Sequence, residues 1–244
     1  MFIIESPPIK MNTLYGQLAE CFDFPSPGFD TRGRVLLDLL RQDYPDAAVE
    51  MERFLGGLPQ DVLDRQELFT RTFDVQSITT LDIGYVLFGD DYKRAELLSN
   101  LSREHKQLEN DCAGELADHL SNVLRLIPKL SDSEVRTELV REIMVPALML
   151  MIREFDPERV EKKKDYYQKH FQTTIAPAPG RDPAVYVHAL RVLLGVLTKD
   201  FEVADRMTVF SGWSGRQVRG FLGLVEKELD IEKNANPTNS VCDA

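Results

Sequence analysis

Apolar residues recur at every third or fourth position along most of this chain, which is the spacing of one face of an α-helix. In the first third of the chain, the spacing predicts helices over residues 11–22, 31–44 and 45–57 and from Pro59 to about residue 73. The second of these carries a single apolar stripe, made of Val35, Leu36, Leu39 and Leu40. Runs of alternating β-branched residues, which are typical of strands, are nearly absent.

The middle of the chain predicts one short helix and one long helix. Thr79 opens a near capping box, Thr-x-x-Asp82, for a short helix that ends at about Phe88. Asp90 and Asp91 then precede a long helix, where acidic residues complement the positive end of the helix dipole. Its buried stripe is expected to hold Leu97, Leu101, His105 and Leu108. Gly114 is placed to end this helix and to begin the next, over residues 114–130.

The last part of the chain predicts a further series of helices. Ser131 is expected to cap a helix that runs to Phe155, with a kink at Pro146 because proline lacks an amide donor. A polar helix or a half-ordered connector follows, then a Pro-rich loop, and Pro183 begins a strongly apolar helix. A final helix is predicted over about residues 215–230. The whole pattern predicts an all-α protein: one helical domain of nine to eleven packed helices over residues 1–229, with a loose tail over 230–244.

Composition narrows the classes of function. The net charge of −11 and the pI near 4.9 argue against nucleic-acid binding, which requires a basic stripe, and favour a basic partner. Three scattered cysteines without a CxxC pair indicate free thiols in a reducing compartment. The N-terminal segment lacks the basic region of a signal peptide, and the most apolar run, Ile143–Ile152, is too short to span a membrane. We therefore expect a cytoplasmic protein without membrane insertion.

Candidate chemistry is sparse, so we expect no catalytic residues and no enzyme. The four histidines lie in separate segments, and no nucleophile, phosphate-loop or zinc-protease motif is present. The best metal-ligand series would share one face if a single helix ran unbroken through His105, Glu109, Cys112, Glu115 and His119. Gly114 interrupts this series, so we expect no bound metal. An all-α metal-binding protein or enzyme that uses this face remains an alternative.

Three segments carry a resemblance to a known family. The first is LFTRTFDVQ, residues 68–76, and the second is YVLFGDDYKRAELLSNL, residues 85–101. The third is GELADHLSNVLRLI, residues 114–127. In their order and spacing they resemble the NarJ/TorD/DmsD family of molybdoenzyme-specific chaperones, and the NarJ branch in particular. Phe69 stands where that branch usually has Tyr, and Ala117 and Ser121 stand where prolines are common.

The resemblance implies a redox enzyme maturation chaperone of the kind found in anaerobic respiration. Members of the family are helical cytoplasmic proteins that bind the N-terminal or leader segment of a molybdenum oxidoreductase catalytic subunit. They hold this subunit until its Mo-bis(molybdopterin guanine dinucleotide) cofactor is inserted, and they delay export where the client has a twin-arginine leader. The segments look most like chaperones that serve nitrate, selenate, chlorate, perchlorate, dimethyl sulfide or ethylbenzene enzymes. The cofactor belongs to the client, and the chaperone itself binds none stably.

The resembling segments also supply candidate client-binding residues. A leader with a basic region and an apolar run requires an apolar groove with acids on its rim. Candidates for the floor are Phe69, Phe73, Tyr85, Leu87 and Phe88, and candidates for the rim are Asp74, Asp82, Asp90 and Asp91. Arg94 and His119 join them through the resemblance. In the alternative interpretation, the aromatic residues are core and the acids cap helices. A general helical adaptor without a role in cofactor insertion is a further alternative.

Overall fold

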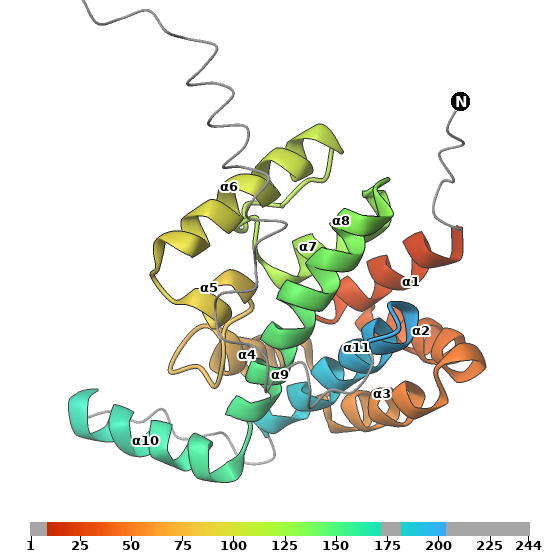
Figure 1. Cartoon of the computed structure of the whole chain (residues 1–244). Coiled ribbons are helices and arrows are strands. Elements are labelled where there is room, and N and C mark those ends of the chain that lie inside the picture. Colours follow the sequence, from red (N-terminus) through yellow and green to blue (C-terminus); the bar gives the residue numbers. More distant parts are fainter. Residues whose placement is uncertain (1–8, 172–181, 204–244) are drawn as a thin grey trace, which may run out of the picture.

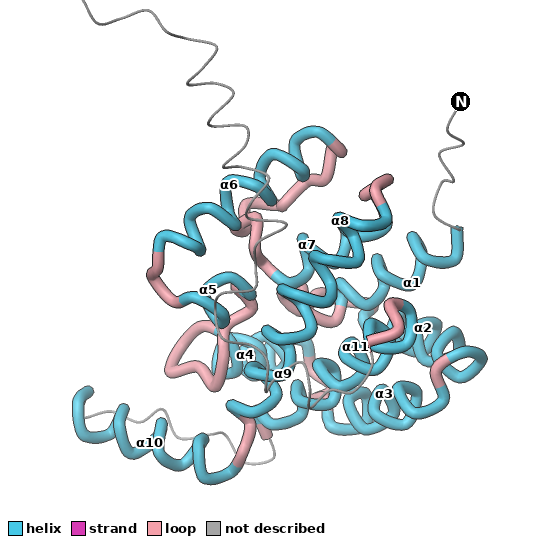
Figure 2. The backbone as a smooth tube through the Cα atoms, viewed as in Figure 1, coloured by secondary structure: helices cyan, strands magenta, loops and turns pink. Residues whose placement is uncertain are grey.

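The computed structural model describes residues 9–171 and 182–203, and these residues fold as packed helices. The prediction of an all-α domain is confirmed for this part of the chain (Figures 1 and 2). The predicted final helix over 215–230 and the predicted tail lie outside the described residues. Within the two described ranges, no helix combines the length and the apolar character needed to cross a bilayer.

The first four helices lie close to their predicted ranges, but the predicted stripe of the second is only partly right, because Val35 is 46% exposed while Leu36 and Leu40 are buried. The four helices are α1 (Ile9–Glu20), α2 (Phe29–Asp43), α3 (Pro45–Gly57) and α4 (Val62–Phe73). Pro45 begins α3 as predicted, because a proline at the first helical position removes only a donor that would be unpaired anyway. The predicted start of α4 at Pro59 is three residues too early. Asp61 is the N-cap there, since its carboxylate accepts hydrogen bonds from the amides of Leu63 and Asp64 at 2.8 and 3.3 Å.

The middle helices correct two of the predicted boundaries. They are α5 (Ile83–Phe88), α6 (Tyr92–Gln107) and α7 (Leu120–Leu126), followed by a short 3-10 turn, Ile127–Lys129. Thr79 does not open α5: its side chain is buried, and Asp82 is the N-cap residue. Gly114 does not end α6, which stops seven residues earlier, at Gln107. A loop with positive φ at Glu109 and Gly114 occupies the gap, so the predicted helix over 114–130 begins only at Leu120.

The last helices are α8 (Ser133–Glu138), α9 (Val145–Glu154), α10 (Pro157–Phe171) and α11 (Tyr186–Asp200), the last preceded by a 3-10 turn at Pro183–Val185. Asp132 and not Ser131 caps α8, by accepting from the amides of Glu134 and Val135. A π-helical segment, Leu139–Met144, joins α8 to α9, and Pro146 is the second residue of α9. Pro146 has no amide hydrogen to donate to the preceding turn. The wider π-helical turn changes the register of the backbone hydrogen bonds, and the helix can therefore continue through the proline.

Two helices organise the core. The helix α11 packs against α3 and α9 and buries Leu190, Leu193 and Leu197 completely, while α1 packs against α7 and α2. The hydroxyls of Tyr15 and Tyr44 donate to the two carboxylate oxygens of Asp200, at 2.9 and 2.6 Å.

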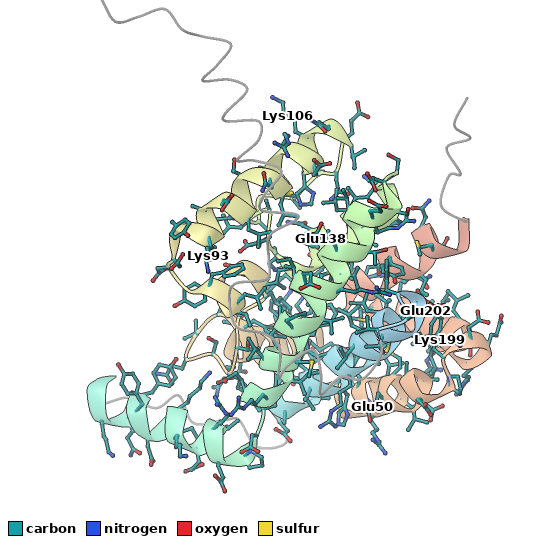
Figure 3. The ribbon with its side chains drawn as sticks, viewed as in Figure 1. Glu50, Lys93, Lys106, Glu138, Lys199 and Glu202 are labelled. Atoms are coloured by element: carbon teal, nitrogen blue, oxygen red, sulfur yellow. The ribbon has the colours of Figure 1, made fainter. Side chains whose placement is uncertain are left out.

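Unlike the core helices, α10 projects from one end of the bundle (Figure 1). Figure 3 places Lys93 near the start of α6 and Lys106 near its end.

Candidate peptide-binding cleft

The third segment that carries the family resemblance pairs with the residues directly before the second segment. An isolated antiparallel bridge pairs Asp82 with His119. The amide of Ile83 donates to the carbonyl of Asp118 at 3.0 Å, and the amide of Leu120 donates to the carbonyl of Leu81 at 2.9 Å. The start of α5 is thereby tied to the start of α7 by backbone bonds.

A cleft of about 550 Å³ lies beside this bridge and is rich in carboxylates. We call it the acidic cleft. Its acidic side chains are Asp23, Asp74, Asp82, Asp111 and Glu115. Its remaining lining is Phe24, Phe69, Thr80, Leu81, Cys112, Ala113, His119, Ser121, Asn122 and Arg125. The guanidinium of Arg125 neutralises only one of the acids, through its hydrogen bonds to both oxygens of Asp23.

The carboxylates of the acidic cleft interact unfavourably with one another. Partial burial raises the pKa of Asp74, and the negative charges of Glu115 and Asp82 raise it further, while His119 lowers it. An acid whose pKa is raised in this way is stabilised by any cation that enters the cleft, because the cation favours the charged form. The planar fork of an arginine fits this requirement, since it can bond to a carboxylate through two donors.

A buried ion cluster supports one wall of the acidic cleft. Arg94 donates to Asp82 Oδ2 at 3.0 Å and to Asp118 Oδ2 at 3.1 Å, and its guanidinium lies 5.1 Å from the centre of the Tyr85 ring. Asp118 is fully buried, and among the described residues its Oδ1 has no hydrogen-bond partner. Burial raises the pKa of Asp118, whereas the hydrogen bond from Arg94 lowers it. The cluster fixes Asp82 in position at the rim.

The structure brings some of the predicted site residues together and separates others. Phe69, Asp74 and His119 line the acidic cleft with Asp82, and Tyr85 and Arg94 reach it through the ion cluster. Phe73 is buried among Phe69 and Tyr186, with both ring centroids at 5.0 Å, so it belongs to the core. The remaining predicted site residues neither line the cleft nor belong to the ion cluster: Phe73, Leu87, Phe88, Asp90 and Asp91.

Sequence reasoning missed the contribution of the loop between α1 and α2. This loop supplies Asp23 and Phe24, and Phe24 is 56% exposed although it is a large aromatic residue. Its ring contacts Phe69 edge-on at 5.7 Å. The available signal was the phenylalanine-rich and proline-bounded stretch FDFPSPG, which is apolar although it is a loop. Only the fold reveals that this loop faces α4 and α7.

The proposed metal-ligand face does not form. Because α6 ends at Gln107, the series from His105 to His119 does not share one helix surface. His105 is buried, its Nε2 lies 3.0 Å from the carbonyl of Ala117, and its Nδ1 lies 2.8 Å from the amide nitrogen of Asn110. Burial lowers the pKa of His105. Across the residues that the structure describes, no three ligand side chains are grouped so that they could hold a metal ion.

No protein-family model matches the chain, and no curated protein matches it.

Proposed function

We propose that this protein is a cytoplasmic chaperone dedicated to the catalytic subunit of a molybdenum-dependent oxidoreductase. It binds the N-terminal or leader segment of that subunit, and it holds the subunit for insertion of the Mo-bis(molybdopterin guanine dinucleotide) cofactor before assembly or export. The observation that carries this proposal is that the first and third resembling segments line one acidic cleft, while Arg94 of the second segment holds Asp82 at its rim. The chaperone acts by binding and release, without catalytic turnover and without a stably bound cofactor of its own.

The chemistry of the acidic cleft suits such a client. A twin-arginine or otherwise basic leader brings positive charge, and the cleft offers five carboxylates, of which Asp23 is paired with Arg125 and Asp82 with Arg94. The exposed ring of Phe24, which packs on the buried Phe69, adds apolar contact area that does not depend on charge. The negative net charge of the whole chain attracts the same segment from a distance.

Two measurements on one client test the proposal. A molybdenum oxidoreductase catalytic subunit from the same organism is produced with and without this chain, and the molybdenum content of the purified subunit is determined. We expect more molybdenum in the subunit when the chain is present. Calorimetry should also detect binding between the chain and a synthetic peptide of the subunit's N-terminal segment.

A matched pair of charge reversals locates the binding surface. The double variant Asp74→Lys/Glu115→Lys should weaken peptide binding, since both acids line the acidic cleft. The control Glu161→Lys/Asp165→Lys makes the same charge change at exposed positions of α10 and should bind like wild type. Peptide binding without any effect on molybdenum content would indicate a general helical adaptor. Equal loss in both variants would contradict a specific role of the cleft.

A further inference from the structure

A second hollow adjoins the acidic cleft and differs from it in chemistry. Its volume is about 410 Å³, within the range of pockets that bury small organic groups. Its floor is formed by Phe29, Phe54 and Tyr186, whose rings contact one another in sequence at 6.2 and 5.3 Å. We call it the aromatic pocket.

The charges on the rim of the aromatic pocket are already balanced. Each of its three arginines has a carboxylate partner: Arg32 pairs with Glu20, Arg65 with Asp30 at 2.7 Å, and Arg125 with Asp23. An anion that entered would compete with these carboxylates, and a cation would meet the guanidinium groups. An uncharged apolar group is therefore the occupant that the pocket favours.

The two hollows share a wall, so one ligand can occupy both. Asp23, Phe24 and Arg125 line the acidic cleft on one side and the aromatic pocket on the other. Behind this wall, Phe69 of the acidic cleft and Tyr186 of the aromatic pocket have ring centroids 5.8 Å apart. Side chains three or four residues apart on a helix lie on one face, about 5–6 Å apart between their Cβ atoms, so a helical segment laid across the shared wall can place one side chain in each hollow.

We propose that the aromatic pocket receives one large apolar side chain of the client segment, three or four residues after a basic residue that occupies the acidic cleft. The inference rests on the proposed function and specifies how the client is read: by the spacing between a positive charge and an apolar side chain in a helical segment. Phe24 separates the two subsites and contacts both side chains.

Synthetic peptides test the spacing directly. Each peptide has about 20 residues, long enough to form a helix on binding, and carries one adjacent pair of arginines in an alanine-rich background. Four peptides carry a single phenylalanine, placed one, two, three or four positions after the second arginine. In the reference peptides, serine replaces the phenylalanine at the third or the fourth position. Calorimetry on the full chain should give affinities for the third and fourth positions about tenfold or more above those for the serine reference, which is the scale expected for burying a phenylalanine.

Variants of the pocket supply the second arm. Ser26→Trp places a large side chain in the aromatic pocket from its exposed rim, and it should abolish the preference for the third and fourth positions. The control Ser99→Trp adds the same side chain at an exposed position of α6 and should keep the preference. Phe24→Ala should weaken binding of the phenylalanine peptides more than binding of the serine reference, because the phenylalanine peptides lose two contacts to Phe24 and the serine reference loses one.

Several outcomes overturn the inference: no binding of any peptide, equal binding at all four spacings, or a spacing preference that survives Ser26→Trp. The proposed function is decided separately, because the molybdenum content of a co-produced catalytic subunit does not depend on these designed peptides. A chain that raises molybdenum content while ignoring the spacing refutes only the aromatic subsite. A chain that reads the spacing without affecting molybdenum content refutes only the chaperone function.

Discussion

At Asp118, the cost of burying a carboxylate opposes the stabilisation that its hydrogen bond from Arg94 provides. Its side chain is fully buried, one oxygen accepts from Arg94, and the other has no partner among the described residues. A buried carboxylate that lacks part of its hydrogen bonding destabilises a fold, and removing its cationic partner costs still more. Arg94 is consequently held by Asp118 from within and by Asp82 at the rim.

The raised pKa of Asp118 predicts a pH dependence of stability. In the unfolded chain an aspartate titrates near pH 4, whereas burial moves the folded pKa higher. Between these values the folded state binds more protons, so the stabilisation that the protonated acid provides is complete below about pH 4 and is lost as pH rises through the folded pKa. Asp118→Asn removes this titration. Urea unfolding at a series of pH values should show the stability of wild type falling relative to the variant as pH rises, and parallel curves would contradict the assignment.

Phe73 and Phe24 make opposite predictions although both are phenylalanines in contact with Phe69. Phe73 is 4% exposed, so Phe73→Ala should lower the free energy of unfolding by about 3–5 kcal/mol, because the cavity adds to the lost burial. Phe24 is 56% exposed, so Phe24→Ala should cost less than about 1 kcal/mol. Denaturant unfolding measures both. Similar losses in the two variants would place Phe73 outside the core.

The start of α6 shows how an element gives neighbouring acids different roles. Asp91 is the N-cap, and its carboxylate accepts from the amide of Lys93 at 3.0 Å. Asp91→Ala should lower the free energy of unfolding by about 1 kcal/mol, whereas Asp90→Ala should change it by less than about 0.5 kcal/mol. Thermal unfolding of the two single variants checks this. The double variant Asp90→Lys/Asp91→Lys would therefore alter stability as well as charge. Asp91→Ala is its control, because this variant loses the cap without gaining positive charge.

The close packing between the start of α5 and the residue Asp118 before α7 requires a glycine at position 84. An ideal Cβ at Gly84 would lie 2.6 Å from Asp118 Oδ2 and 3.1 Å from Leu97 Cδ2. Gly84→Ala should therefore destabilise the protein by about 1–3 kcal/mol, as overpacking of a filled interior typically does. Gly16→Ala is the matched control: a Cβ there meets no atom within 4 Å, and alanine favours a helix interior by about 0.5–1 kcal/mol. If both variants melted above wild type, the close approach of Asp118 would not be a constraint.

At the scale of the whole molecule, the net charge of −11 predicts how binding responds to salt. Association of a basic, apolar peptide should slow markedly as ionic strength rises, because screening shortens the reach of the attraction. The apolar part of the affinity should persist, since hydrophobic burial is not screened. Association and dissociation rates measured from low to high salt separate the two parts. An association rate that does not change with salt would contradict electrostatic steering.

The fold was more predictable than the site, for a physical reason that particular residues illustrate. Helical periodicity is local, so the bounds of α3 and the buried positions Leu97, Leu101 and His105 followed from neighbouring residues alone. Leu108, the fourth predicted position of that stripe, lies after the helix end and is only partly buried. The acidic cleft is assembled from the α1–α2 loop, the end of α4, and the two segments joined by the Asp82–His119 bridge. No local sequence pattern indicates that Asp23 and Asp74 line the same cleft. The loop after Gln107 was also missed, because the helical spacing of polar residues continues there although Glu109 and Gly114 adopt positive φ.

The bonds of Tyr15 and Tyr44 to Asp200 also constrain when the protein can fold. They span 185 and 156 residues of sequence, and α11 contributes nine buried residues to the core that α3 helps to form. Contacts between distant parts of a chain slow folding, because the intervening loop must close before they form. While the chain is being synthesised and α11 has not yet emerged from the ribosome, the apolar faces of α3 and α9 are therefore exposed. The protein completes its own core only after nearly all of the described chain has been synthesised, so a translation product that stops before Tyr186 should be prone to aggregation and degradation.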